Sequence, residues 1–150
     1  MSGSVLYRPV NMGDMGFILK TWIRDFRKSP WSGPYEKELK TQIIKETIEE
    51  TFNVPSTTTI IASLEDVKDQ IFGFCCFDPK KVLVHYLYVK PAYRRMRIGR
   101  DLLSIASKNK PFAYTHKTRF HRFYGPDARY RPDALWRKAP SRKTIQKATS

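Results

Sequence analysis

The chain has 150 residues, of which 41% are hydrophobic, and this is the size and composition of one ordinary folded domain. No apolar run approaches the roughly 20 residues that a membrane-spanning helix needs, so we expect no membrane partner. The net charge is +14 and it is uneven, because residues 91–150 contain 16 lysines and arginines against three aspartates, a net of +13. Such an excess favours a polyanionic partner: a phosphorylated cofactor, a nucleic acid or an acidic protein.

The two cysteines and residues 1–10 indicate the cellular compartment of the protein. Cys75 and Cys76 are adjacent, so they do not readily bridge each other, and a reducing environment fits best. Residues 1–10 show neither a charged region nor an apolar run of the secretory type. We therefore predict the cytoplasm, or the host cytoplasm if the protein is viral.

The N-terminal half reads as one strand and two helices. Residues 5–8 predict a short strand, and Asn11 or Asp14 can cap a helix over 15–28. Prolines and a glycine in 29–34 break this helix. Apolar residues at helical spacing predict a second helix over 35–52.

Strands dominate the next part of the chain. Three β-branched or aromatic segments with short connections predict an antiparallel meander, over residues 57–64, 70–77 and 82–89. A helix opened by Gly99 should end before Pro111, followed by a short strand at 112–115 and a short helix at 118–124. Residues 1–136 are predicted to form a single domain, with a basic, flexible tail at 137–150.

An arginine-rich turn stands between the last strand of the meander and the next helix. Pro91 ends the strand, and four arginines surround Gly99 at the point where the helix should begin. A helix N-terminus offers N–H groups without intrahelical partners and a partial positive charge. The turn is therefore suited to a phosphate or pyrophosphate.

The order of elements, together with four sequence segments, resembles the GNAT superfamily of acyl-CoA N-acyltransferases. The segments are LYRPVNMGDMGFI (6–18), IFGFCCF (71–77), LYVKPAYRRMRIGRDLL (87–103), which is similar to the acyl-CoA signature, and RFHRFYG (119–125). HYLYVK and YRRMRIG in a small basic protein also resemble GNAT-like proteins of bacteriophages. The resemblance implies an α/β (α+β) fold: a mixed, mostly antiparallel central sheet flanked by about four helices, here with truncated or irregular C-terminal strands.

The resemblance also implies a cofactor, acetyl-CoA or another acyl-CoA, and a set of residues that holds it. Backbone groups of Leu87, Tyr88 and Val89 would bond the pantetheine arm. The pyrophosphate would be held by the segment after the strand, namely Arg94, Arg95, Met96, Arg97, Ile98, Gly99 and Arg100. Arg97 departs from the pattern, because it stands where the family usually has its first glycine. If that position needs a positive φ, arginine is strained there, and if it needs an N–H alone, arginine adds useful charge.

Three residues are candidates for the chemistry of acyl transfer. Tyr124 stands where the resemblance places the tyrosine that protonates the thiolate, and a core aromatic is an equal alternative. His85 lies on the central strand, near where the resemblance places a base, although a buried structural histidine is the favoured interpretation. His116, at the end of the following strand, can face the cleft. The three histidines and two cysteines lack metal-ligand spacing, so we predict no metal.

Basic and aromatic residues alternate after residue 118. Aromatic rings can stack on bases while cations neutralise phosphates, and the predicted polyanion contacts are Arg119, Arg122, Arg129, Arg131, Arg137 and Lys138. Alternatively, the aromatics complete the core and the cations form a solvated rim. The resemblance to the GNAT superfamily implies an N-acyltransferase that transfers an acyl group directly from acyl-CoA to an amine acceptor. The alternative is a GNAT-like protein that binds or modifies nucleic acid.

Overall fold

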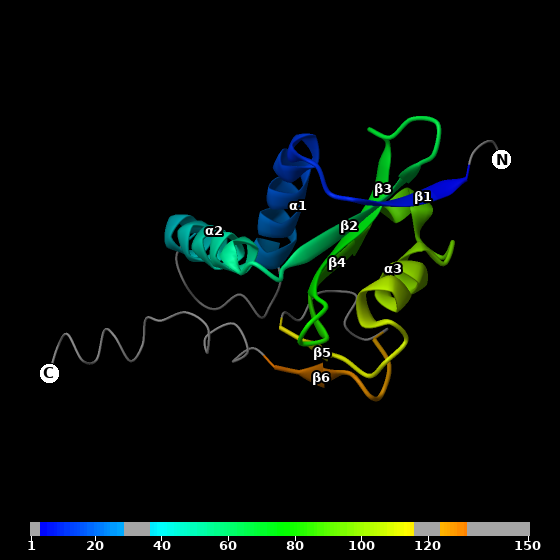
Figure 1. The fold of residues 1–150 in the computed structure, drawn as a ribbon. Helices are drawn as coiled ribbons and strands as arrows, with labels where there is room; N and C mark the ends of the chain where they lie inside the picture. The colour runs from blue at the N-terminus through cyan, green and yellow to red at the C-terminus, as the bar shows by residue number, and fades with distance from the viewer. Residues whose placement is uncertain (1–3, 29–36, 116–123, 132–150) are drawn as a thin grey trace, which may run out of the picture.

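The computed structural model describes residues 4–28, 37–115 and 124–131, and a single twisted sheet runs through them (Figure 1). Its six strands lie side by side in chain order. The first four pair antiparallel, while β4 with β5 and β5 with β6 pair parallel. The strands are β1 (Val5–Pro9), β2 (Thr58–Leu64), β3 (Ile71–Asp78), β4 (Leu83–Val89), β5 (Ala113–Tyr114) and β6 (Arg129–Tyr130).

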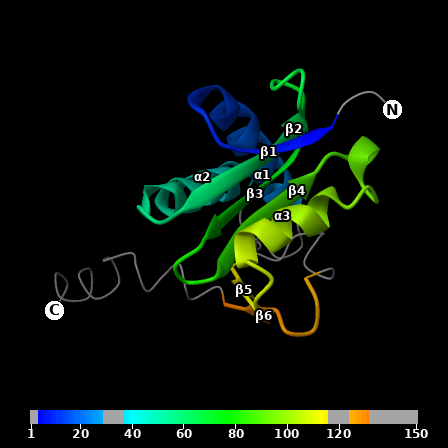
Figure 2. The ribbon, with the colours of Figure 1, turned by 45° about the vertical axis from the view of Figure 1, so that its right-hand side comes forward.

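Helices cover both faces of this sheet (Figure 2). On one face, α1 (Met15–Lys28) and α2 (Lys37–Asn53) bury Ile18, Trp22 and Ile48 against β3 and β4. On the other face, α3 (Ile98–Ser107) buries apolar side chains against the same two strands. Two short 3-10 helices, η1 (Met12–Asp14) and η3 (Pro91–Tyr93), lead into α1 and α3. Among the described residues, β3 and β4 are therefore enclosed between two helical layers, and every residue of both strands is buried.

The predicted fold class is confirmed: a mixed α/β fold with a mostly antiparallel sheet and irregular C-terminal strands. The predicted meander and the bounds of the first helix are also correct. Of the predicted helix at 118–124, all but Tyr124 lies outside the described residues, as does the predicted tail at 137–150. The sequence did not predict β6, which has two residues and lies in a segment broken by prolines.

Gly73 in β3 permits a close backbone approach between β3 and β4. A Cβ atom at this position would lie 2.4 Å from the carbonyl oxygen of Tyr88 in β4, which is far inside van der Waals contact. Any side chain at residue 73 would therefore push β3 and β4 apart. Because β4 carries the segment predicted to bind a cofactor, this glycine fixes the position of that segment.

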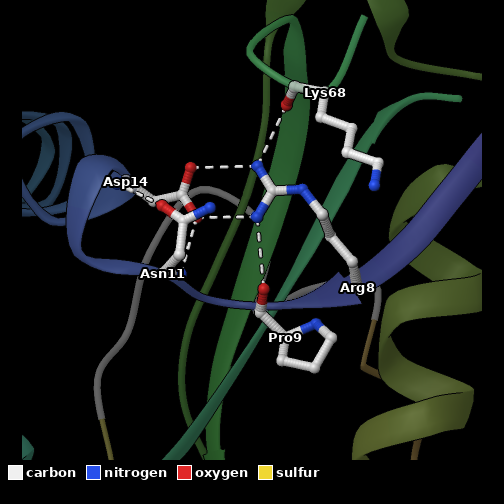
Figure 3. Close-up of polar contacts among 5 residues, drawn as sticks. All are labelled: Arg8, Pro9, Asn11, Asp14 and Lys68. Carbon is white, nitrogen blue, oxygen red and sulfur yellow. Dashed lines mark hydrogen bonds and ion pairs between the residues drawn. The ribbon is translucent and has the colours of Figure 1, made fainter. Parts of the chain in front are cut away.

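A buried ion pair joins β1 to η1, just before the start of α1 (Figure 3). The Arg8 guanidinium donates to both carboxylate oxygens of Asp14, at 2.7 and 3.0 Å, and to the carbonyl oxygen of Lys68 at 3.0 Å. Asp14 also accepts from the backbone N–H of Asn11, whose side chain caps η1 in return. Hydrogen bonding from Arg8 lowers the pKa of Asp14 below its usual range. The pair fixes the direction in which the chain leaves the sheet and enters α1.

In the part of the chain that the structure describes, no helix is long and apolar enough to cross a bilayer.

We expect Gly73→Ala to lower the free energy of unfolding by at least about 2 kcal/mol, because the new methyl group overlaps a backbone oxygen that cannot rotate away. Gly16→Ala is the matched control, since no atom lies within 4 Å of the added Cβ in α1. The control should raise stability by up to about 1 kcal/mol. Urea unfolding of the two variants measures the difference, and equal stabilities would contradict the close approach.

We expect Asp14→Ala to cost about 3 kcal/mol, because the substitution leaves the Arg8 guanidinium buried without its carboxylate partner. Replacing both partners, as in Arg8→Met/Asp14→Leu, should cost less than the single change, since no charge is then left buried. Thermal and urea unfolding of the two variants show which of them is the more stable. A double variant less stable than Asp14→Ala would show that the pair contributes through packing rather than charge.

Candidate functional site

The sheet opens along one edge of β4. β3 pairs with β4 from Leu83 to Val89, whereas β5 pairs, within the described residues, with Leu83 and Val84 alone. Hydrogen bonds of 3.0 Å flank this second contact, from the Ala113 N–H to Val82 O and from the Thr115 N–H to Val84 O. Beyond them, the edge of β4 toward Val89 has no partner strand in the described part of the chain. An extended ligand with amide groups can pair with such an edge as an added strand.

A bulge in β4 decides which backbone groups face this open edge. The register with β3 shifts between Cys76 and Phe77, so His85 is an extra residue in β4. Past the bulge, the Lys90 N–H bonds to Phe72 O, so residues 88 and 90 turn their backbone groups toward β3. Leu87 and Val89, which alternate with them, turn theirs to the open edge. Of the three residues predicted to bond the pantetheine arm, Tyr88 therefore faces β3 instead.

The loop after β4 leads directly to the start of α3. Its arginine side chains at 95, 97 and 100 are exposed, and that of Arg94 is half-buried. The Arg94 guanidinium donates through Nε to Val89 O at 2.9 Å, so this arginine ties the loop to the end of β4. The sequence gives no signal for that contact, because an arginine five residues after a strand is usually solvated.

The first turn of α3 presents backbone donors next to these arginines. The first intrahelical bond runs from the Asp101 N–H to Arg97 O, at 2.9 Å. The N–H groups of Ile98, Gly99 and Arg100 precede it and have no partner within the helix. Arg97, the N-cap residue, offers no side-chain hydrogen bond to them. Donor groups, the positive end of the helix dipole and exposed guanidinium groups thus converge beside the open edge of β4, an arrangement that binds phosphate groups.

Two arginines in this loop adopt left-handed backbone conformations. Arg97 has φ 67° and ψ 4°, and Arg95 has φ 68°. Position 97 therefore does take the positive φ for which glycine is favoured, and arginine is strained there by about 1 kcal/mol. The sequence alone suggested a positive φ at Arg97 as one of two alternatives. It contained no indication of a positive φ at Arg95.

Gly99 has a different role from Gly73. Its φ is not positive, and a Cβ atom would lie 3.5 Å from Val89 Cγ2 and 3.8 Å from Leu87 Cδ2, which is ordinary contact. The position tolerates a methyl group, whereas a larger side chain would press α3 away from β4. Gly99 thus allows close packing of the helix N-terminus on the strand.

His85 lies in the β4 bulge and is 4% exposed. Its Nδ1 is 2.9 Å from Oγ1 of Thr115, the residue just after β5. Burial lowers the pKa of His85 to about 4, against a smaller opposing effect of Asp78. The imidazole is therefore neutral at pH 7, and it connects β4 to the end of β5 beside the point where the two strands part.

Tyr124 is 7% exposed and packs in the core on the α3 side. Its ring meets those of Phe112 and Tyr114 edge-on, with centroids 5.5 and 5.0 Å apart. His116 lies outside the described residues. Of the predicted polyanion contacts, Arg129 and Arg131 are at β6, while Arg119, Arg122, Arg137 and Lys138 are outside the described residues. In the described ranges, no group of three His, Cys, Asp or Glu side chains can hold a metal ion.

We expect Arg97→Gly to raise the free energy of unfolding by up to about 1 kcal/mol, because glycine adopts the left-handed conformation without strain. The same change three residues later, Arg100→Gly, should lower stability by about 1 kcal/mol, since residue 100 is helical. Chemical unfolding of both variants tests the opposite signs. A loss of stability in both would show that position 97 does not hold a positive φ.

We expect His85 to make stability depend on pH. The folded protein keeps His85 neutral down to about pH 4, while the unfolded chain protonates it near 6.5, so the unfolded state binds more protons between these values. Stability should fall as the pH drops from 6.5 toward 4, by about 3 kcal/mol in total. In a His85→Gln variant the decrease between pH 6.5 and 5 should shrink. Unfolding curves at several pH values measure it, and parallel pH profiles for the two proteins would contradict the burial of a neutral imidazole.

Comparison with known proteins finds a matching domain family for part of the chain. Residues 55–125 match the model of the acetyltransferase (GNAT) domain, a span that includes β2 to β5, the arginine-rich loop and α3. A search of curated protein sequences finds no match.

Several solved structures are similar at low identity. A GCN5-related N-acetyltransferase from Rhodopseudomonas palustris is 20% identical, with 72% of this chain and 67% of that chain covered and a TM-score of 0.48. The PaiA N-acetyltransferase from Thermoplasma acidophilum, solved with coenzyme A, is 21% identical, with 70% of each chain covered and a TM-score of 0.48. NAA60 from Arabidopsis thaliana, solved with acetyl-CoA, is 18% identical, with 70% of this chain and 66% of that chain covered and a TM-score of 0.42.

The match over residues 55–125 contains both the open edge of β4 and the start of α3. It agrees with the resemblance carried by residues 71–77 and 87–103. Over residues 55–125 the chain therefore matches the acetyltransferase (GNAT) domain.

Proposed function

We propose that the protein is an N-acetyltransferase that transfers the acetyl group of acetyl-CoA directly to an amine acceptor, without a covalent enzyme intermediate. The observation that carries this proposal is the opening of the sheet between β4 and β5 beside the start of α3. One end of the site suits an extended amide chain, and the other suits phosphate groups. Acyl-CoA combines these two chemistries in one molecule, and the GNAT family match supports the same assignment.

The residues of this chain fit such a cosubstrate. Leu87 and Val89 turn backbone groups to the open edge, where the pantetheine amides would pair with them. The N–H groups of Ile98, Gly99 and Arg100 would receive the pyrophosphate, and the exposed guanidinium groups of Arg95 and Arg97 would add charge. Acetyl-CoA itself would supply an activated thioester.

The protein must still align the amine, accept its proton and donate a proton to the departing thiolate. Tyr124, His85 and His116 are the proposed residues for these proton transfers. Tyr124 is proposed as the donor to the thiolate, since its hydroxyl is a weak acid. His85 would act as a neutral imidazole, and its low pKa makes it a weaker base than an exposed histidine. His116, one residue after Thr115, is proposed as a second base.

We further propose that the acceptor or a partner is polyanionic, either a nucleic acid or an acidic protein, because one cosubstrate does not balance a net charge of +13 on residues 91–150. The proposed compartment is the cytoplasm, since Cys75 and Cys76 are both free and buried.

We expect the protein to bind acetyl-CoA, with an affinity that Arg97→Gln weakens about tenfold through loss of a charged donor to phosphate. The control is Lys45→Gln, which removes the same charge from an exposed site on α2. Isothermal titration calorimetry with acetyl-CoA measures both. Gly99→Ala should retain binding, whereas Gly99→Trp should weaken it by displacing α3 from β4.

The absence of acetyl-CoA binding at millimolar concentration would overturn the proposed function. Equal affinities of Arg97→Gln and Lys45→Gln would instead overturn the placement of the phosphates at the start of α3.

A further inference from the structure

A second basic site lies at the opposite end of β4. A pocket of about 530 Å³ opens between the β3–β4 turn, the segment before β5 and the segment that forms β6. Its lining contains three cations, Lys81, Arg129 and Arg131, against one carboxylate, Asp127. Pro111, Phe112 and Pro126 supply apolar walls. The volume is in the range of pockets that hold small molecules, about 300–1,000 Å³, and the lining has a net charge of +2.

The backbone holds the cations of this pocket in place. The Arg129 N–H bonds to Phe112 O at 3.1 Å, and the Arg131 N–H bonds to Tyr114 O at 2.7 Å. Because the two arginines are two residues apart on a strand edge, their side chains project from one face. On the other side, the buried Asp78 accepts from the backbone N–H groups of Lys80 and Lys81 and so fixes the turn. The pocket is therefore built by hydrogen-bonded backbone.

Val82 in the pocket wall is strained. Its φ is 52°, in the left-handed region that β-branched residues rarely adopt. The conformation places Val82 O at 3.0 Å from the Ala113 N–H, the first bond between β4 and β5. Strain of this kind persists only where surrounding structure imposes it, and it gathers at functional sites. This observation is independent of the charge of the lining.

The pocket is separate from the acyl-CoA site. It lies at the start of β4, whereas the arginine-rich loop follows the end of that strand, and seven residues of strand separate them by about 20 Å. Figure 2 shows β5 and β6 near the end of α3 and thus far from its N-terminus.

We propose that this pocket binds one unstacked nucleotide of a single-stranded nucleic acid. Its phosphate would be held by Lys81, Arg129 and Arg131, with the sugar and base against Phe112 and the two prolines. A nucleotide in a duplex is stacked between its neighbours and cannot enter a concave pocket, whereas a single strand can place one there. The charge of +13 on residues 91–150 favours a polymer of phosphates over a free anion. The inference identifies the polyanionic partner proposed above and does not depend on acyl transfer.

Fluorescence anisotropy with a labelled single-stranded oligothymidylate tests the proposal across a series of salt concentrations. Arg129→Gln/Arg131→Gln should weaken binding at least about tenfold relative to a control with the same charge change, Lys20→Gln/Lys45→Gln. The slope of log affinity against log salt should decrease by up to about 0.7, since the two arginines contact the same phosphate of the single strand. Lys81→Gln, on a different element, should weaken binding several-fold, so the test does not depend on the folding of the double variant.

Acetyl-CoA calorimetry on the double variant keeps the two proposals apart, because its affinity should equal that of the unmodified protein. Equal oligothymidylate affinity and equal salt slope in the double variant and its control would overturn the inference. So would tighter binding of a duplex of the same length. Binding of inorganic phosphate that is lost in the double variant, with oligothymidylate binding unchanged, would also overturn it in favour of a small phosphorylated ligand.

Discussion

The unequal pairing of β4 is the constraint on which the rest of the structure depends. On one edge β3 pairs with it throughout, and Gly73 permits a backbone approach that no side chain could allow. On the other edge β5 joins it at Leu83 and Val84, and the described chain supplies no strand beyond them. A strand held this firmly on one side can leave backbone groups open on the other without losing its position. The rigidity of the β3–β4 pair is thus what makes an open edge compatible with a stable sheet.

The loop after β4 joins this open edge to the proposed site for phosphate. Arg94 bonds back to Val89 O, while Arg95 and Arg97 take left-handed conformations that lead the chain sharply into α3. Glycine would relieve that strain but would remove a positive charge at each position. Arginine at such a position therefore costs about 1 kcal/mol of backbone stability. It also adds a positive charge beside a helix N-terminus, where an anion is already favoured. If the ligand is a phosphate, its attraction to the added charge can offset the backbone strain. Without an anionic ligand, the strained arginines have no evident benefit.

Features set by local sequence were predictable, and features set by tertiary pairing were not. The bounds of α1 follow from its apolar spacing and its capping residues, and the meander follows from three β-branched segments with short turns. The bulge at His85 was not predictable, because an extra residue in β4 is visible only against its partner β3. The Arg8–Asp14 pair also escaped prediction, since both residues read as ordinary polar residues until the end of β1 is folded back on η1.

The sequence predicted a concentration of charge after residue 90, and the structure divides that charge between two ends of one strand. Arg95, Arg97 and Arg100 gather after the end of β4, and Arg129 and Arg131 join Lys81 before its start. Like charges repel, so their gathering at two separate places costs stability unless each place meets an anion. Each place also contains a non-glycine residue at positive φ, Arg97 at one and Val82 at the other. These two costs, one at each end of β4, support the two anion sites that we propose there.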